Sequence, residues 1–168
     1  MKPTETHIRK VESGGLFRSA TYLLEQTQLI EKSRTEVFSF FSDAHNLERL
    51  TPTFLNFKIL TAAPIAMGQG TLIDYRLKLY GVPIKWRTEI ETFEPESRFT
   101  DQQLSGPYAL WHHQHHFEDA EEGTLMKDIV RYRVRFGIFG TIAHALFVRR
   151  SLTRIFQFRS TAVHEVFA

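Results

Sequence analysis

Apolar and polar residues alternate along most of the chain between residues 54 and 135. A period of two is typical of β-strands that bury one face. The predicted strands are 20–30, 56–61, 70–80, 84–94, 98–105, 111–118 and 124–135. Glycine, proline and acidic turn residues separate them, and such short links favour antiparallel neighbours in a meander.

After Gly137 and Gly140 the apolar period changes to 3.6 residues, which predicts an α-helix. One broad apolar face contains Ile142, Ala145, Leu146, Leu152, Ile155, Phe156, Ala162, Val163 and Val166. At about 1.5 Å per residue, a helix of this length crosses the whole concave face of a sheet. Arg149, Arg150, Arg154 and Arg159 fall mostly beside the apolar face, and we interpret them as its solvated basic side.

Two short helices are expected between the first strand and the meander. Ser33 and Glu36 have the spacing of a capping box, and Asp43 is suited to cap a second helix that ends before Pro52. The second helix, 44–50, contains a single arginine and no base-reading pattern, so we expect no nucleic-acid partner. The pair is interpreted as the closure of one end of the sheet.

These elements predict an α+β fold in which a curved antiparallel sheet of six to seven strands wraps around one long C-terminal helix. Residues 1–19 are polar with a Gly14-Gly15 pair, and we expect a flexible leader or a loosely docked arm there. Residues 20–168 are expected to form one domain, since 168 residues suffice to bury a sizeable core.

Composition adds an expected cavity and an expected compartment. The chain has 15 phenylalanines, more than a compact core of this size needs, which favours a large apolar interior. A net charge of +2 is no nucleic-acid signature, and the absence of cysteine excludes disulfides and thiolate chemistry. The sequence contains neither a signal peptide nor an apolar run of membrane-spanning length, so a cytoplasmic location is expected.

Alternation also predicts which side chains point inward. The predicted inward face is largely apolar but includes Tyr75, Trp86, Asp101, Gln103, Trp111, His113, His115, Asp128 and Tyr132. Buried carboxylates and imidazoles must be paired or solvated. A partly wet cavity therefore explains this set better than an ordinary core.

The hairpin turns suggest how the inward polar residues pair. A turn centred near Tyr108 would set Asp101 opposite His115 and Gln103 opposite His113. The next hairpin would set Asp128 opposite His115, and a slip of two residues would move it to His113 instead. Two flanking carboxylates would favour the charged form of His115.

These residues resemble the START-related SRPBCC (START/Bet v 1-like) superfamily. The resemblance covers about residues 20–167 and rests on the motifs Phe99-x-Asp101-x-Gln103, Gly106-Pro107-Tyr108, Trp111-x-His113-x-His115-x-Phe117 and Met126-x-Asp128-x-Val130-x-Tyr132. The sequence is most similar to the bacterial ligand-binding and polyketide cyclase/dehydrase-like subgroup. The resemblance implies a helix-grip fold with a hydrophobic cavity. Superfamily members bind lipids, sterols, polyketides, quinones and plant hormones, and a few are cyclases or dehydratases.

We expect the chain to bind or carry a small hydrophobic molecule such as a lipid, a quinone or a polyketide-like compound. The predicted ligand contacts are Tyr75, Trp86, Thr88, Gln103, Trp111, His113, His115, Met126, Asp128 and Tyr132. The alternative is a cyclase or dehydratase that uses His115 with Asp128 and Asp101 as an acid–base set, with Tyr132 or Tyr75 polarising an enolate oxygen. The polar row could instead only hold the sheet in register.

Two further partners, a zinc ion and a membrane surface, would each use residues of this sequence. His113 and His115 share a face and could bind Zn²⁺ with an aspartate, but no motif supplies a third ligand at a known distance, so we expect no metal and no cofactor. Arg149, Arg150, Arg154 and Arg159 lie beside Phe139, Phe147, Phe156 and Phe158, which is compatible with a transient membrane contact. The oligomeric state is expected to be a monomer or a homodimer.

Overall fold

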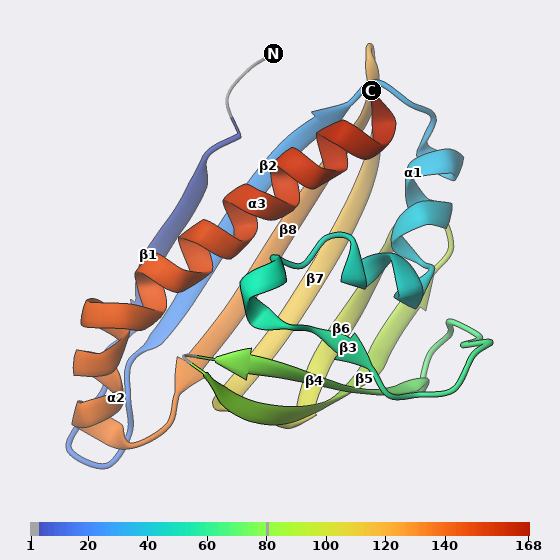
Figure 1. The fold of residues 1–168 in the computed structure, drawn as a ribbon. Coiled ribbons are helices and arrows are strands. Elements are labelled where there is room, and N and C mark those ends of the chain that lie inside the picture. Colours follow the sequence, from blue (N-terminus) through green and yellow to red (C-terminus); the bar gives the residue numbers. More distant parts are fainter. Residues whose placement is uncertain (1–3, 80) are drawn as a thin grey trace.

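A computed structural model describes residues 4–79 and 81–168 as a single curved antiparallel sheet wrapped around a long helix (Figure 1). The strands are β1 (Thr6–Glu12), β2 (Thr21–Ile30), β3 (Lys58–Ile59), β4 (Leu72–Leu79), β5 (Val82–Glu94), β6 (Arg98–Ser105), β7 (Tyr108–Ala120) and β8 (Gly123–Val134). Their order in the sheet is β1-β2-β8-β7-β6-β5-β4-β3. The α+β helix-grip prediction is confirmed, with eight strands instead of six or seven.

The additional strand is β1, which lies within the segment predicted to be a polar leader. It pairs along β2 from Thr6 opposite Gln26 to Glu12 opposite Thr21. Glu12 also binds Arg18 and Arg131 through its carboxylate. The expectation of a loose arm is wrong for Thr6–Glu12. The two apolar residues of β1, Ile8 and Val11, fall on opposite faces of the strand, so periodicity could not detect it.

The C-terminal helix runs across the concave face of the sheet (Figure 1). It consists of α2 (Gly137–Ala143), a π-helical turn (His144–Val148) and α3 (Arg149–Phe167). The inward side of α3 carries Leu152, Phe156, Arg159, Ala162 and Val163. Among the described residues, no helix is both long and apolar enough to cross a bilayer.

Short helices cover the part of the sheet that α3 leaves open (Figure 1). Helix α1 (Arg34–Phe41) begins at Ser33, whose hydroxyl accepts a hydrogen bond from the Glu36 backbone N–H as predicted. A 3₁₀ helix (Ala44–Glu48) follows and is capped by Asp43. A further 3₁₀ turn (Thr53–Leu55) leads into β3. The predicted second helix is therefore present in the tighter 3₁₀ form.

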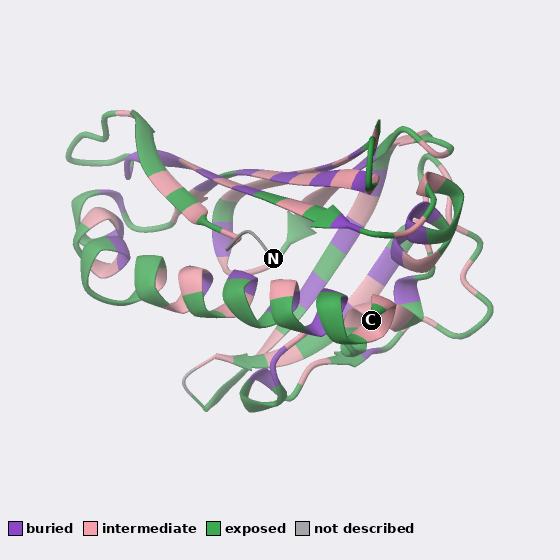
Figure 2. Ribbon diagram, turned by 90° about the horizontal axis from the view of Figure 1, so that it is seen from above, coloured by how far each residue is buried: buried purple, intermediate pink, exposed green. Residues whose placement is uncertain are grey.

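Buried residues occur along the strands of the sheet and along α3 (Figure 2). Near α1 the interior is filled by an aromatic cluster that includes Phe38, Phe99 and Phe117, with Phe38 and Phe117 packed edge to face. A second buried cluster contains Tyr75, Trp86 and other residues of the cavity wall. The apolar interior is thus filled around Phe38 and Phe117, and a cavity lies beside this cluster between the sheet, the short helices and α3.

Candidate ligand-binding cavity

A cavity of about 190 Å³ lies between the sheet, the short helices and α3. One water molecule needs roughly 10–15 Å³, so the space exceeds a hydration site more than tenfold. Its apolar lining includes Phe41, Leu50, Phe57, Ile73, Leu77, Trp86, Ile90, Tyr108, Trp111, Leu152, Ile155 and Phe156. Both tryptophans of the chain are among these residues.

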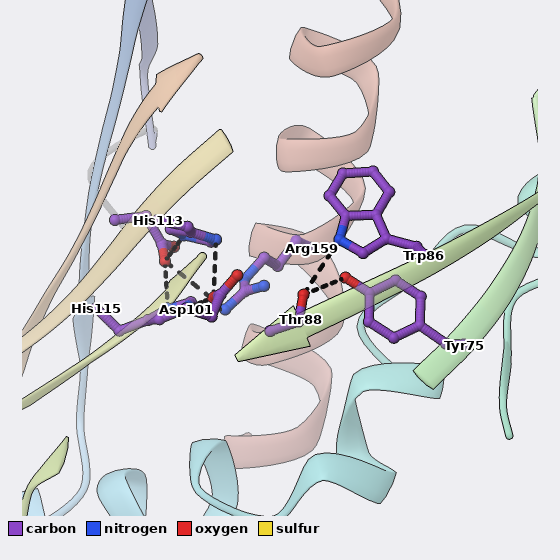
Figure 3. Close-up of polar contacts among 8 residues, drawn as sticks. Tyr75, Trp86, Thr88, Asp101, His113, His115 and Arg159 are labelled. Atoms are coloured by element: carbon purple, nitrogen blue, oxygen red, sulfur yellow. Dashed lines mark hydrogen bonds and ion pairs between the residues drawn. The ribbon is translucent and has the colours of Figure 1, made fainter. Parts of the chain in front are cut away.

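One side of the cavity has a compact set of neutral polar groups (Figure 3). The Trp86 indole N–H donates to the Thr88 hydroxyl at 3.1 Å, and the Tyr75 and Thr88 hydroxyls are 3.1 Å apart. Burial raises the pKa of Tyr75 well above its ordinary value. Tyr75 is therefore a neutral phenol at physiological pH. The three side chains satisfy one another and present a mainly apolar surface to the cavity.

A charged cluster borders the cavity where β6 and β7 lie next to α3. His115 Nε2 is 2.9 Å from Asp101 Oδ2, and His115 Nδ1 is 2.8 Å from Asp128 Oδ1. His113 Nε2–H donates to the same Asp128 oxygen at 2.9 Å. The guanidinium of Arg159 lies 3.7 Å from that oxygen. Asp128 therefore contacts three groups, which are His113, His115 and Arg159.

The two histidines differ in charge. Burial opposes the charged form of His115, but its hydrogen bonds to Asp101 and Asp128 outweigh burial and raise its pKa. Burial and the neighbouring His115 charge lower the pKa of His113 to about 4. His115 is thus the histidine that is protonated more readily. Neutral His113, which donates through Nε2, keeps Nδ1 as an acceptor.

Both carboxylates remain ionised in spite of their burial. Burial would raise the pKa of Asp101, yet the hydrogen bond from His115 and the histidine charges lower it. The pKa of Asp128 is lowered further, because the Arg159 charge and hydrogen bonds from both histidines outweigh burial. The cluster accordingly holds negative charges on Asp101 and Asp128 beside the positive charge of Arg159, and the charged form is more favoured in His115 than in His113.

The pairing predicted from the hairpins is correct in one turn and wrong in the other. Asp128 lies opposite His115 as predicted. Asp101 lies opposite His113 instead of His115, because the turn is centred one residue before Tyr108, which is already in β7. The predicted hydrogen bond between His115 and Asp101 is nevertheless present, since the side chains reach each other diagonally across the strands.

The structure brings most predicted contact residues to the cavity. Tyr75, Trp86, Thr88, Asp101, Trp111, His113 and His115 all line it.

Four predicted residues lie outside the described lining. Gln103 binds the backbone of Tyr108 with both ends of its amide, and it occupies the space that a side chain on Gly106 would need. Met126 packs in the aromatic cluster near α1. Asp128 is buried beneath the histidines, and the Tyr132 hydroxyl is 2.8 Å from His144 Nε2.

The position of Arg159 differs from the one predicted. The solvated basic side expected for the helix includes Arg159, but the side chain is buried and lines the cavity. The helical spacing contained a signal: Arg159 is three residues after Phe156 and four before Val163, both of which face inward. Its charge alone led to its assignment to the outer face.

Asp101, His113 and His115 offer three ligand atoms within 4.8 Å of one another, which is the donor number of a catalytic zinc site. However, Arg159 Nη2 lies 3.4 Å from His115 Nδ1, and this fixed positive charge opposes a second cation. The nitrogens are also engaged by carboxylates. These residues suit proton exchange and anion contact better than metal binding.

Comparisons with known proteins agree with this architecture. A family model described as polyketide cyclase / dehydrase and lipid transport matches residues 30–157. No curated protein matches the chain in sequence.

Solved structures share the fold at low sequence identity. TTHA0849 from Thermus thermophilus has a TM-score of 0.68 at 16% identity, covering 85% of this chain and 94% of that one. Major latex-like protein 151 from Panax ginseng has a TM-score of 0.61 at 12% identity, with 88% and 98% covered.

A third structure is longer than this chain. The nucleoside-diphosphate sugar epimerase from Corynebacterium glutamicum has a TM-score of 0.59 at 26% identity, and the match covers 84% of this chain but 28% of that one. The family match spans most of the domain and the neighbours share its fold. The chain therefore belongs to the polyketide cyclase / dehydrase and lipid transport family, within the SRPBCC (START/Bet v 1-like) superfamily.

Proposed function

We propose that this protein binds or carries a small hydrophobic molecule, such as a lipid, a quinone or a polyketide-like compound, in the cavity beneath α3. The observation that carries the proposal is the cavity of about 190 Å³ with apolar walls and few convergent polar groups. Such a combination is typical of small-molecule sites.

The close packing elsewhere in the interior also supports a ligand-binding role for the cavity. The aromatic cluster around Phe38 and Phe117 is densely packed. Protein interiors contain few voids larger than a water molecule, and unfilled cavities destabilise the fold. An apolar ligand would recover roughly 25 cal/mol for each Å² of apolar surface that it removes from water.

Ligand entry can be tested by blocking the cavity. Ala44 is buried and lines it, so Ala44→Phe should fill the space. Because both tryptophans line the cavity, their fluorescence reports occupancy directly. Titration with 1-anilinonaphthalene-8-sulfonate should give saturable energy transfer from tryptophan in the wild type and in the exposed control Ala62→Phe, but not in Ala44→Phe. Equal binding by all three proteins would contradict the proposal.

An enzyme of the cyclase or dehydratase kind is a second candidate, favoured by the unequal charge states of the two cavity histidines. Groups whose pKa values are separated by their environment suit acid–base roles. Neutral His113 would accept a proton next to a ketone through Nδ1, and charged His115 would donate to the enolate oxygen.

The enzyme reading can be separated from carriage with a β-diketone that bears a long alkyl chain. An enzyme would exchange its α-protons with D₂O faster than buffer does, and His113→Asn would abolish the excess exchange while the diketone still bound. Binding without excess exchange by the wild type would contradict the enzyme reading and leave the carrier.

A further inference from the structure

Arg159 is an unusual feature of an apolar cavity. Its side chain is only 10% exposed, and its Nε–H has no hydrogen-bond partner among the described residues. Its nearest polar contacts, His115 Nδ1 at 3.4 Å and Asp128 Oδ1 at 3.7 Å, are long for hydrogen bonds. The ring of Phe41 lies 5.3 Å from its guanidinium carbon. The guanidinium therefore retains donors that the protein does not use.

Such an arrangement is unfavourable for folding alone. Buried donors without partners destabilise a protein, and a buried charge needs close compensation. An apolar residue at this position would continue the inward stripe of Phe156 and Val163. The remaining arginines of the helix, Arg149, Arg150 and Arg154, are exposed. Among these four arginines, only Arg159 lines the cavity. Its unpaired N–H donor can bind an acceptor atom of a ligand there.

The surroundings limit the chemistry of that acceptor. Figure 3 shows the guanidinium between the Asp101–histidine cluster and Thr88. Asp101 repels an anion on its own side, and Asp128 is covered by the histidines. The two nitrogens of His115 are held by Asp101 and Asp128, so these carboxylates are already occupied beside Arg159. A planar guanidinium matches a carboxylate in two-point geometry, so a carboxylate is the acceptor that fits best.

We propose that the cavity binds an amphipathic carboxylic acid, with its carboxylate on Arg159 and its apolar chain along Trp86 and Trp111. This inference rests on the proposed function, because it assigns the headgroup of the ligand in the same cavity. It explains why a basic residue stands on the inward face of α3 next to an already neutral cluster.

The test compares oleate with methyl oleate by isothermal titration calorimetry at pH 7.4. The two ligands share an apolar chain, and only oleate carries a charge. The wild type should bind oleate about tenfold more tightly, as a charge-assisted hydrogen bond warrants. Arg159→Met should reduce this preference to less than about twofold without weakening methyl oleate binding, whereas Arg159→Lys should retain part of it. The exposed control Arg150→Met should behave as the wild type.

Equal affinity of the wild type for both ligands, or a preference that survives in Arg159→Met, would overturn the headgroup assignment while leaving hydrophobic binding intact. Binding of neither ligand by the wild type would contradict the proposed function together with the assignment. Thermal unfolding of each variant verifies that it is folded.

A second, independent observation concerns the outer surface around α2. Large apolar side chains are exposed there: Leu16, Phe17, Phe136, Ile138, Phe139, Ile142 and Leu146, together named the α2 surface. Phe17, Phe136 and Phe139 are 92%, 80% and 75% exposed. The backbone N–H of Ile138 donates to the Leu16 carbonyl at 3.5 Å, so the two segments adjoin at one end of the molecule (Figure 1).

Most charges around the α2 surface are positive, although Arg18 is paired with Glu12. Residues 13–24 and 129–164 contain no aspartate or glutamate. Arg18, Arg135, Arg149 and Arg150 are exposed in these same segments. Protruding aromatic and aliphatic side chains with a basic border are typical of proteins that insert shallowly into an anionic bilayer. A protein partner would not require a predominantly positive border, so this border favours a lipid surface.

We infer that the α2 surface docks on anionic membranes. Co-sedimentation with phosphatidylcholine vesicles that contain phosphatidylglycerol should retain the wild type, and pure phosphatidylcholine vesicles should retain much less. The double variant Phe17→Ser/Phe139→Ser should bind about tenfold more weakly, because each exposed aromatic loses apolar burial in the interface. Val82→Ser, at an exposed position on the β4–β5 hairpin, should bind as the wild type.

No retention on anionic vesicles, or equal retention of the double variant, would overturn this inference. Analytical ultracentrifugation measures the oligomeric state of the wild type and of the double variant. A dimer that the same two substitutions dissociate would assign the α2 surface to a second copy of the chain and would also overturn it.

Discussion

The molecule contains two buried histidine networks that differ in their partners and in their relation to the cavity. His113 and His115 contact Asp101, Asp128 and Arg159 on the cavity wall. His144 lies under the helix instead, where its Nε2 is 2.8 Å from the Tyr132 hydroxyl and its ring stacks on Tyr22 at 3.4 Å. Neither His144 nor Tyr132 is part of the described cavity lining.

The comparison teaches that burial alone does not decide the charge of a histidine. Burial and the Arg149 charge lower the pKa of His144 to about 4, because its partner is a neutral phenol. His115 is equally buried, yet two carboxylates raise its pKa. A carboxylate partner creates a charged group next to the cavity, and a phenol partner creates a neutral structural contact. The first network is therefore suited to ligand chemistry and the second to packing.

The largest expected effect is that of Asp128→Ala. This substitution removes the carboxylate shared by both cavity histidines and leaves the charges of His115 and Arg159 without it. Breaking a buried ion pair in this way costs about 3–5 kcal/mol. Urea unfolding at pH 7 measures the loss. Asp119→Ala, which removes an exposed ion pair with Arg34, should cost less than about 1 kcal/mol. A loss for Asp128→Ala no greater than that of the control would contradict the account of the charged cluster.

A smaller loss is expected in the second network. Tyr132→Phe removes the hydroxyl that donates to neutral His144 and leaves a buried acceptor unsatisfied. The expected cost is about 1–3 kcal/mol of unfolding free energy. Affinity for an apolar probe should not change, because neither residue is in the cavity lining. Weaker probe binding without a change in stability would reverse the roles assigned to the two networks.

The pH dependence of stability distinguishes the networks by sign. His113 and His144 titrate near 4 in the folded state and near 6.5 when unfolded, so their stabilisation is present above about 6.5 and declines as pH falls towards 4. Each contributes a slope of at most about 1.4 kcal/mol per pH unit. His115 acts oppositely, since its raised pKa stabilises the fold below about 6.5 and this contribution disappears as pH rises through its folded pKa.

Unfolding free energies measured between pH 4 and 9 check this prediction. His144→Asn should flatten the rise in stability between pH 4 and 6.5, whereas His115→Asn should leave that rise unchanged and remove a decline in stability above about pH 6.5. A profile in which both substitutions change the slope in the same direction would show that the two histidines share one charge state.

The smallest effect is expected for Gln103→Ala. Gln103 joins the backbone of Tyr108 through both its amide nitrogen and its amide oxygen, at 2.9 and 3.2 Å. Its loss should cost about 1 kcal/mol. Ligand affinity should be unchanged, which isothermal titration can establish. A large loss of affinity without a change in stability would show that Gln103 contacts the ligand.

Much of this fold could be predicted because alternation and helical spacing report directly on buried faces. The inward sides of β4, β5 and β8 follow from single charged residues that must face water, such as Lys85 and Arg131. The pairing of β6 with β7 could not be predicted as securely, because a turn displaced by one residue changes the register by two.

Two features of the interior depend on contacts that periodicity does not encode. Arg159 has inward helical spacing, but its charge implies solvent unless its buried partners are known. Tyr132 has the inward orientation predicted for it, yet the helix brings His144 to its hydroxyl. Both cases require the position of the C-terminal helix over the sheet, which neither strand alternation nor helical spacing supplies.

The most direct test of the central claim is native mass spectrometry of delipidated protein after incubation with a total lipid extract. The account predicts a 1:1 complex with an apolar molecule in the wild type and in Ala62→Phe, and none in Ala44→Phe. Organic extraction of the complex then identifies the molecule. A wild type that remains empty, or an equal adduct on Ala44→Phe, would contradict the claim that the cavity beneath α3 is a binding site.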